Sequence, residues 1–386
     1  MTNRFSRGMS RATDLTRAGK LDEATALIQS LLQPTSAPHD PTADDGAIEG
    51  TFTRIDEPAP KQPGEPPAAE PALRRARKGL GETLRGIAAG GMPRRGPLAP
   101  TTIDLPQGAQ FLSLTHAGQG GSRDYRLYVP ATRPDGPAPL IVMLHGCTQS
   151  PEDFAAGTGM NALGEEIGCL IAWPGQTNGA NPQKCWNWFR PEDQERDRGE
   201  PALIAGIVRD ILRDHPADPA RIYAAGLSAG GAAAAILGAA YPDLFAAVGV
   251  HSGLPVGGAR DVPSAFAAMR SGATGGALPV TVPTIVFHGL ADTTVHPGNG
   301  DAVAAQALKP RPGLARVRSG AVSEGGRSYR QTRHHDPSGR SIIEHWEVEG
   351  AGHAWSGGRP AGSYTDPNGP DASREMMRFF LQHTRG

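Results

Sequence analysis

One serine in the sequence stands in a setting that suits a nucleophile. The segment 226–230 reads Gly-Leu-Ser-Ala-Gly, with Ser228 at its centre. An abrupt strand-to-helix turn needs small residues on both sides of a nucleophile, because neighbouring Cβ atoms would clash there. The short motif alone is weak, but Ile222 and Tyr223 before it favour a strand, and the alanine-rich run after it favours a helix. The pattern therefore predicts a nucleophile elbow at Ser228.

The carboxylate that would orient a catalytic base is expected at Asp292. It stands in the loop after the apolar run 284–288, and open α/β sheets gather their active sites at the carboxyl ends of the strands. Two other interpretations stay open: Asp292 could cap the following helix, and Asp301 could be the acid instead. Asp301 has the position of an ordinary first-turn helical residue, so we assign the role to Asp292.

The base that would take the serine proton is expected at His353. This histidine follows the run 342–348 and lies in the segment Gly-Ala-Gly-His-Ala-Trp-Ser-Gly-Gly, whose flexible backbone leaves the imidazole free to reach another loop. His288 and His296 flank Asp292 and are the competing candidates. A base taken from beside the acid would break the order serine, acid, histidine that α/β hydrolases share.

Two backbone N–H groups are expected to bind the negative oxygen that forms when a carbonyl is attacked. The apolar run 140–144 leads into His145, Gly146 and Cys147, and a His-Gly pair after the third strand brings its backbone close to the nucleophile turn. The N–H groups of Cys147 and Ala229 would converge there as an oxyanion hole. His145 itself reads as a structural residue bonded within its loop.

The three cysteines are too few for a disulfide scaffold and lack the spacing of a zinc site. No metal and no other cofactor is expected. Cys147 has a candidate partner in Cys185, which lies in a long polar loop, and a bridge would tie this loop to the oxyanion strand. Cys169 stands inside an apolar strand and is expected to be a buried free thiol.

Three tryptophans are candidate walls of an apolar pocket for the acyl or alcohol group of a substrate, namely Trp186, Trp188 and Trp355. The first two follow Cys185 closely, and the third lies two positions after His353. Ordinary loop packing is the alternative interpretation.

Apolar runs alternate with amphipathic ones from about residue 110 onward. This alternation predicts an α/β fold, a mostly parallel sheet with helices on both faces. The region 106–386 is therefore expected to form the catalytic domain. We expect strands at 111–115, 124–129, 140–144, 169–173, 222–225, 246–250, 284–287 and 342–348, and helices at 152–166, 201–214, 232–240, 301–308 and 372–383.

The first 105 residues differ in composition from the rest. Residues 1–33 are expected to form an N-terminal helical hairpin, because two apolar stripes at helical spacing are separated by Gly19 and Lys20. Residues 34–105 read as a disordered linker, rich in proline at first and later basic and amphipathic. The basic segment 72–88 could contact a granule or an anionic surface. A solvated basic helix is the alternative.

Charge and hydropathy argue against several classes of function. The formal net charge of -1 and a pI near 6.9 give no electrostatic case for a nucleic-acid partner. No apolar run reaches the length of about 20 residues that a membrane-spanning helix needs. The basic N-terminus is not followed by the apolar core of an ordinary secretory signal.

Five short motifs in one order carry a resemblance to a known family. They are LHGCTQ at 144–149, CWNWF at 185–189, GLSAGG at 226–231, HGLAD at 288–292 and GAGHAWSGG at 350–358. Together they resemble the polyhydroxybutyrate depolymerase family of esterases, which are relatives of the feruloyl and acetylxylan esterases.

The resemblance implies an α/β-hydrolase catalytic domain in which Ser228, Asp292 and His353 act together. It also implies a disulfide between Cys147 and Cys185 and an ester substrate. We expect a serine esterase for short-chain polyhydroxyalkanoate polymer or oligomers, with a feruloyl or acetylxylan esterase as the close alternative. A non-catalytic protein that binds granules or surfaces is the alternative of another class. The family favours an extracellular location, whereas the N-terminal sequence leaves a cytoplasmic one open.

Overall fold

The computed structural model describes residues 103–386 apart from 119, 133, 274–275 and 277–279. The expected N-terminal hairpin and the basic segment 72–88 lie outside the described residues, as does nearly all of the expected linker. Within the described part, no helix has the length and apolar character needed to cross a membrane.

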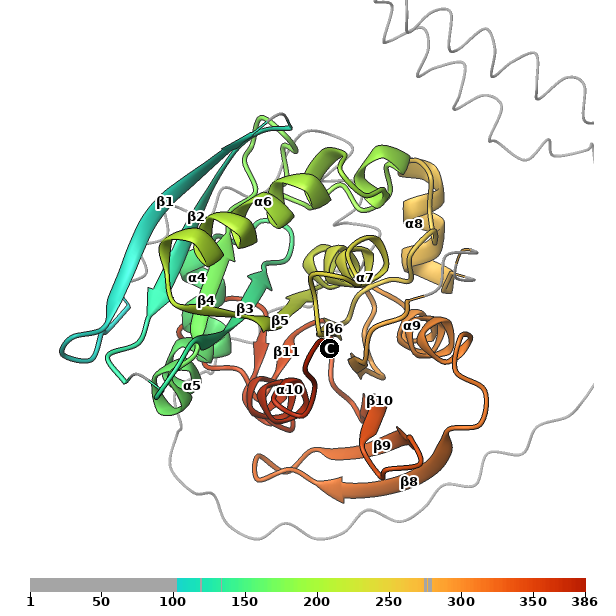
Figure 1. The fold of residues 1–386 in the computed structure, drawn as a ribbon. Helices are drawn as coiled ribbons and strands as arrows, with labels where there is room; N and C mark the ends of the chain where they lie inside the picture. Colours follow the sequence, from blue (N-terminus) through green and yellow to red (C-terminus); the bar gives the residue numbers. More distant parts are fainter. Residues whose placement is uncertain (1–102, 119, 133, 274–275, 277–279) are drawn as a thin grey trace, which may run out of the picture. The chain divides into compact units, whose positions relative to one another are not determined.

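The described residues build one large sheet of ten strands in the order β1-β2-β4-β3-β5-β6-β7-β10-β9-β8 (Figure 1). The central strands from β4 to β10 run parallel to one another, whereas β1, β2, β8 and β9 add antiparallel pairs at the two edges. The strands are β1 (Gln110–Gly118), β2 (Gly121–Val129), β3 (Ala138–Leu144), β4 (Leu170–Pro174), β5 (Ala217–Leu227), β6 (Ala247–His251), β7 (Thr284–Gly289), β8 (Ala315–Val322), β9 (Ser328–His335) and β10 (Ser341–Val348). A separate parallel pair joins β11 (Trp355–Ser356) to β12 (Thr365–Asp366).

Helices cover both faces of the sheet, as the alternating apolar runs predict (Figure 1). One core cluster holds side chains of α6, α7, α8 and α9, and the other holds side chains of α4, α5 and α10. Strand β3 is buried on both faces, since Val142 packs into the first cluster and Ile141 into the second. The helices are α4 (Pro151–Thr158), α5 (Met160–Ile167), α6 (Gly199–Asp214), α7 (Ala229–Ala240), α8 (Val262–Ser271), α9 (Gly298–Leu308) and α10 (Ala372–Phe380), with a 3-10 turn η1 (Pro191–Gln194).

Two details differ from the sequence-based prediction. The single helix expected at 152–166 is two helices, because Gly159 takes a left-handed conformation with φ 64° and ends α4. A Cβ atom at Gly159 would lie 2.5 Å from the side chain of Arg359, so the break is also a place of close packing. Six further elements were not predicted, namely α8, β8, β9, the 3-10 turn η1 and the short strands β11 and β12.

Candidate active site

Ser228 occupies the sharp turn between β5 and α7. Its backbone has φ 59° and ψ -119°, a conformation that residues other than glycine adopt only under local strain. The turn is closely packed: a Cβ atom at Gly230 would lie 2.0 Å from the carbonyl oxygen of Leu144, and one at Gly226 would lie 2.4 Å from the backbone of Gly230. Glycines at these two positions are therefore a steric requirement of the turn, and the strand-to-helix geometry expected for 226–230 is present.

Asp292 and His353 form a close pair. The Nδ1 atom of His353 lies 2.7 Å from Oδ2 of Asp292, and the N–H groups of Thr294 and Val295 donate to Oδ1 at 2.8 and 2.9 Å. His288 adds a nearby donor, because its Nε2 atom lies 2.9 Å from the carbonyl of Val295 and 3.5 Å from Oδ2 of Asp292. His288, a competing candidate for the base, thus lies beside the same carboxylate oxygen that His353 contacts.

These contacts decide the charge of Asp292. Burial alone would raise the pKa of this carboxyl group, but hydrogen bonds from His288, His353 and the Val295 N–H hold the pKa well below its ordinary value. Asp292 is therefore ionised at neutral pH, and its Oδ2 atom accepts a hydrogen bond from the Nδ1–H group of His353. In a neutral imidazole with Nδ1 as the donor, Nε2 is the atom that can accept a proton.

His251 connects the serine turn with the histidine loop. Its carbonyl oxygen accepts the N–H of Ser228 at 2.9 Å, and its Nε2 atom accepts the N–H of Ser356, three positions after His353, at 2.9 Å. Burial lowers the pKa of His251 to about 3, so this imidazole is neutral. Sequence reasoning missed this residue, since a histidine that ends an apolar strand carries no local sign of its two distant partners.

The hydroxyl of Ser228 and the Nε2 atom of His353 have no hydrogen-bond partner among the described residues. Ser228 is 8% exposed and the side chain of His353 is 12% exposed. No direct bond joins them in this structure. Catalytic hydrogen bonds are often long before a substrate binds and tighten only in the complex. Both polar groups thus have unused hydrogen-bonding capacity.

The predicted oxyanion loop lies against the serine turn. A Cβ atom at Gly146 would lie 3.7 Å from the Cβ atom of Ser228. Neither the N–H of Cys147 nor that of Ala229 has an acceptor within the described part of the chain. Ala229 is also the first residue of α7, where the helix dipole favours negative charge. Two unpaired donors beside a serine suit a developing oxyanion.

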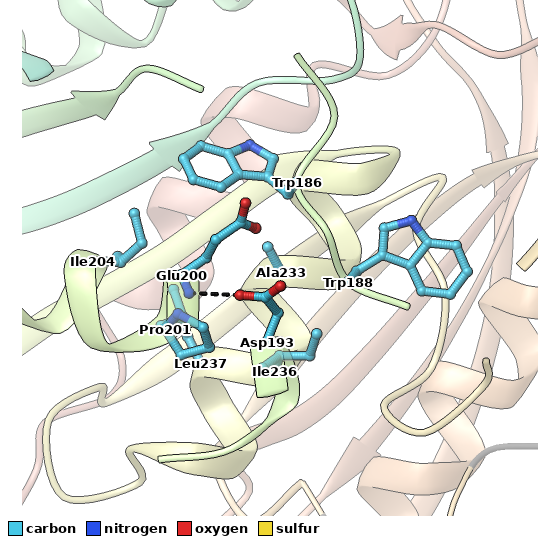
Figure 2. A pocket seen from close by; sticks show the side chains of 9 residues that line it. All are labelled: Trp186, Trp188, Asp193, Glu200, Pro201, Ile204, Ala233, Ile236 and Leu237. Atoms are coloured by element: carbon cyan, nitrogen blue, oxygen red, sulfur yellow. Dashed lines mark hydrogen bonds between the residues drawn. The ribbon is translucent and has the colours of Figure 1, made fainter. Parts of the chain in front are cut away.

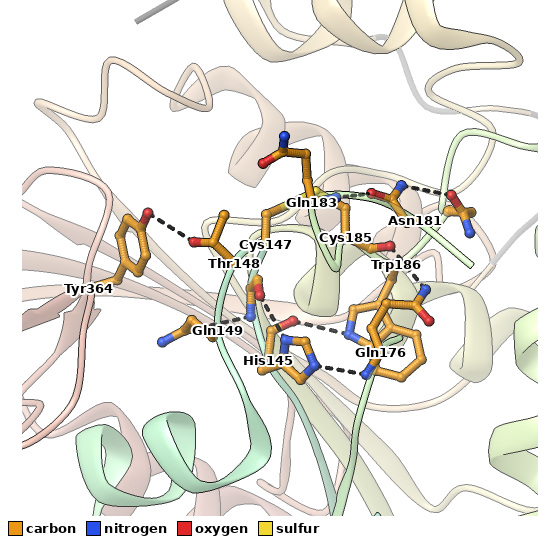
Figure 3. Close-up of a disulfide and its surroundings, with 12 residues drawn as sticks. His145, Cys147, Thr148, Gln149, Gln176, Asn181, Gln183, Cys185, Trp186 and Tyr364 are labelled. Carbon is orange, nitrogen blue, oxygen red and sulfur yellow. Dashed lines mark hydrogen bonds between the residues drawn. A yellow bond between two sulfur atoms is a disulfide. The ribbon is translucent and has the colours of Figure 1, made fainter. Parts of the chain in front are cut away.

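A disulfide joins Cys147 to Cys185, 38 positions apart (Figure 3). Beside it, the N–H of Thr148 donates to the carbonyl of Gln183 at 2.7 Å. The bridge and this bond fix the 176–188 loop to the oxyanion loop. Cys169 is buried and free, as predicted, and burial raises the pKa of its thiol.

The structure corrects the picture of three tryptophans around an open pocket. Trp186 and Trp355 are 0% and 1% exposed, and Trp188 is 6% exposed. The indole of Trp355 packs on His251 and donates to Ser373, so this side chain belongs to the core. Trp186 and Trp188 line a cavity of only about 10 Å³ (Figure 2), which is at the lower limit for one water molecule. The alternative interpretation, loop and core packing, describes these contacts better.

The sheet order, the helices on both faces and the elbow at the end of a central parallel strand define an α/β-hydrolase fold. Residues 123–325, more than half of the chain, match the family described as Esterase PHB depolymerase. The chain belongs to this family, which confirms the resemblance carried by the five motifs.

Individual relatives agree with this family. Poly(3-hydroxyalkanoate) depolymerase C of Paucimonas lemoignei is 32% identical over 240 residues, which make up 58% of this chain and 57% of that protein. Feruloyl esterase B of Thermothelomyces thermophilus is 34% identical over 140 residues, 36% of this chain and 47% of that protein. The chain thus spans about half the length of these curated relatives.

A solved structure shares the fold. The acetyl xylan esterase from Aspergillus awamori superposes with a TM-score of 0.55 at 19% identity, covering 71% of this chain and 99% of that chain. At this identity the likeness bears on the fold alone.

Proposed function

We propose that this chain is a carboxylic ester hydrolase that works through Ser228, with His353 as base and Asp292 as the acid that orients it. The observation that carries the proposal is the 2.7 Å contact between His353 and an ionised Asp292, in a fold that holds Ser228 in a strained strand-to-helix turn. A carboxylate bonded to Nδ1 fixes the imidazole tautomer whose Nε2 can take the serine proton.

The reaction would proceed in two halves. The Ser228 oxygen attacks the ester carbonyl while its proton moves to Nε2 of His353, and the carbonyl oxygen becomes an oxyanion held by the N–H groups of Cys147 and Ala229. The tetrahedral species collapses, the C–O bond to the alcohol breaks, and His353 returns the proton to the leaving alcohol. Water then attacks the acyl-enzyme with the same proton transfers and releases the acid.

The substrate class that we favour is a short-chain polyhydroxyalkanoate, as polymer or as soluble oligomers. Support comes from the family match and from the depolymerase of Paucimonas lemoignei. A feruloyl or acetylated xylan ester is the second candidate, because the feruloyl esterase matches at the higher identity over a shorter stretch. The Cys147–Cys185 disulfide supports an extracellular or otherwise oxidising location, where such bridges persist.

A product assay distinguishes these substrates. The purified chain would be incubated with poly(3-hydroxybutyrate) suspension, its soluble oligomers, methyl ferulate and acetylated xylan, and the released acids would be quantified by chromatography. We expect 3-hydroxybutyrate and short oligomers as the main products. Release of ferulate or acetate with no 3-hydroxybutyrate would reassign the substrate. Release of nothing from any ester would favour a non-catalytic binding protein.

A further inference from the structure

A buried carboxylate outside the five motifs lies beneath the tryptophan-bearing loop. Glu200 is in the first turn of α6 and is 7% exposed. It borders the small cavity under Trp186 and Trp188, where its own backbone N–H donates to Asp193 at 2.8 Å (Figure 2). Burying a carboxylate is costly in free energy unless it is paired and hydrogen-bonded. The hydrogen-bond partners of Glu200 therefore indicate which segment it stabilises.

Both oxygens of Glu200 accept hydrogen bonds from the 176–188 loop. Oε2 accepts the backbone N–H of Asn187 at 2.7 Å. Oε1 accepts the side-chain amide of Asn187 at 2.8 Å and that of Gln176 at a shorter distance. Three donors from the two ends of one loop therefore converge on a single carboxylate. All three are satisfied only when both carboxylate oxygens act as acceptors.

The 176–188 loop also holds the backbone segment 145–147, which includes the proposed oxyanion donor, the N–H of Cys147. The N–H of Gln176 donates to Nε2 of His145 at 3.0 Å, and the indole N–H of Trp186 donates to the carbonyl of His145 at 3.0 Å (Figure 3). Cys185 is bonded to Cys147 itself. Of these anchors, Gln176 is a direct partner of Glu200, and Cys185 and Trp186 stand within two positions of its other partner, Asn187. Gln149, which accepts the N–H of Gly146 at 2.9 Å, holds the segment independently of Glu200.

A buried arginine completes the cluster. Arg123 is 4% exposed and donates to the side-chain carbonyl of Gln176 at 2.5 Å, which leaves the Gln176 amide pointing to Glu200. Its guanidinium also lies 5.8 Å from the centre of the Trp186 ring. The orientation of Gln176 is therefore set from both ends.

We propose that Glu200 is a positioning residue for the oxyanion hole: its carboxylate gathers Gln176 and Asn187, and through them fixes His145 and Cys147 beside Ser228. This inference rests on the proposed function. It predicts that loss of one carboxylate oxygen slows the chemical step more than it weakens substrate binding, because the oxyanion forms only during the reaction.

The test compares Glu200→Gln with wild type in two assays at pH 8, above the raised pKa of about 7, so that Glu200 is ionised. Hydrolysis of p-nitrophenyl butyrate gives kcat and KM per titrated active site, and the labelling rate with a fluorophosphonate reports on attack by Ser228 without an ester. The glutamine NH2 must face one of the three donors, so the loop should shift. We expect kcat and the labelling rate to fall about 10- to 100-fold, because a misplacement of about 1 Å can cost about 100-fold in rate, with KM changed less than about threefold.

A matched control is Glu344→Gln. Glu344 is 0% exposed and accepts hydrogen bonds from Gln331, Trp346 and Arg378, so its loss also disturbs a buried carboxylate cluster. It lies on β10, away from the oxyanion loop, and the variant should lose stability while keeping kcat. If Glu200→Gln does not fold, Asn187→Ser removes one donor to Glu200 and keeps the backbone N–H, and it should lower kcat in the same way.

The outcomes separate this inference from the proposed function. Wild-type kcat in the Glu200→Gln protein, or in Asn187→Ser, would overturn the positioning role while the esterase assignment stands. An equal loss of kcat in Glu344→Gln would also overturn it, since general loosening would explain both. A wild-type chain that neither hydrolyses an ester nor reacts with the fluorophosphonate at Ser228 would contradict the proposed function itself.

Discussion

The Nδ1 atom of His353 lies 2.7 Å from Oδ2 of Asp292, although the two residues are 61 positions apart in the chain. The contact follows from strand pairing. Strands β7 and β10 are parallel neighbours whose registers end together, with Val348 opposite Gly289, so the loops after them leave the same edge of the sheet. Gly289 allows the close approach, because a Cβ atom there would lie 2.4 Å from the carbonyl of Ala351.

Replacing Asp292 with asparagine should leave the fold intact and remove most of the activity. An amide in place of the carboxylate can donate to Nδ1 and so favours the wrong imidazole tautomer. We expect kcat to fall by about 100- to 10,000-fold with little change in KM. Steady-state kinetics with p-nitrophenyl butyrate measure this, and circular dichroism checks the fold. A loss of less than about threefold would show that Asp292 does not orient the base.

Reducing the disulfide should loosen the oxyanion loop. A disulfide that closes a loop of this length contributes about 2 to 4 kcal/mol to the free energy of unfolding in the chain-entropy account. The double variant Cys147→Ser, Cys185→Ser should therefore unfold at lower denaturant and have a lower kcat. Thiol counting under denaturing, non-reducing conditions should find one free cysteine, Cys169. Three free thiols under the same conditions would refute the bridge.

The glycines around Ser228 should not tolerate a methyl group. A Cβ atom at Gly230 would lie 2.0 Å from the Leu144 carbonyl, whereas nothing lies within 4 Å of one at Gly136. Gly230→Ala should lower the free energy of unfolding by about 3 kcal/mol or more, and Gly136→Ala should change it little. Chemical denaturation of both variants measures the difference. Equal stability of the two would contradict the tight elbow.

The stability of the chain should depend on pH through Glu200. Burial and the nearby charge of Asp193 raise the pKa of Glu200 from 4.5 to about 7, against hydrogen bonds from Asn187 and Gln176 that favour the ionised form. The folded state therefore binds this proton more tightly than the unfolded chain does. The stabilising contribution is fully present below about pH 4.5 and is lost as the pH rises through about 7.

The comparison of wild type with Glu200→Gln isolates this effect. Asp193, whose pKa is also raised by burial, and Arg123 are common to both proteins. Between pH 4.5 and 8, the free energy of unfolding of wild type should fall by up to about 3 kcal/mol relative to that of the variant. Denaturation curves at several pH values measure it. A difference that is constant across this range, or that moves in favour of wild type, would contradict the raised pKa.

The parts of the site that could be predicted from the sequence stand in short motifs after apolar strands. Ser228, Asp292 and His353 each follow such a strand, and the common edge of a parallel sheet brings such positions together. His251, which contacts the serine turn and the histidine loop, and Glu200, which contacts the 176–188 loop, could not be found in this way. Their partners come from distant loops, and nothing in the neighbouring sequence marks the contact.

The edge strands β8 and β9 were not predicted for a related reason. Strand β8 reads Ala-Arg-Val-Arg-Ser-Gly-Ala-Val and is exposed along its whole length. Its alternation of apolar and charged residues ends after Arg318, which is too short to identify a half-buried strand. The pairing with β9 identifies it instead. The three tryptophans offered as pocket walls are buried instead. A large aromatic side chain in a loop can fill the core as readily as line a pocket, and the sequence does not distinguish the two.

The central claim is that Ser228 is the nucleophile. Replacing it with alanine removes only the Oγ atom, in a turn that already requires small residues around it, so the fold should be unchanged. The decisive measurement is hydrolysis of p-nitrophenyl butyrate by the Ser228→Ala protein next to wild type, with mass spectrometry of both after fluorophosphonate treatment. We predict that hydrolysis falls by at least about 1,000-fold and that wild type alone gains one adduct, on Ser228. Turnover by Ser228→Ala within about tenfold of wild type, or an adduct elsewhere, would contradict the assignment.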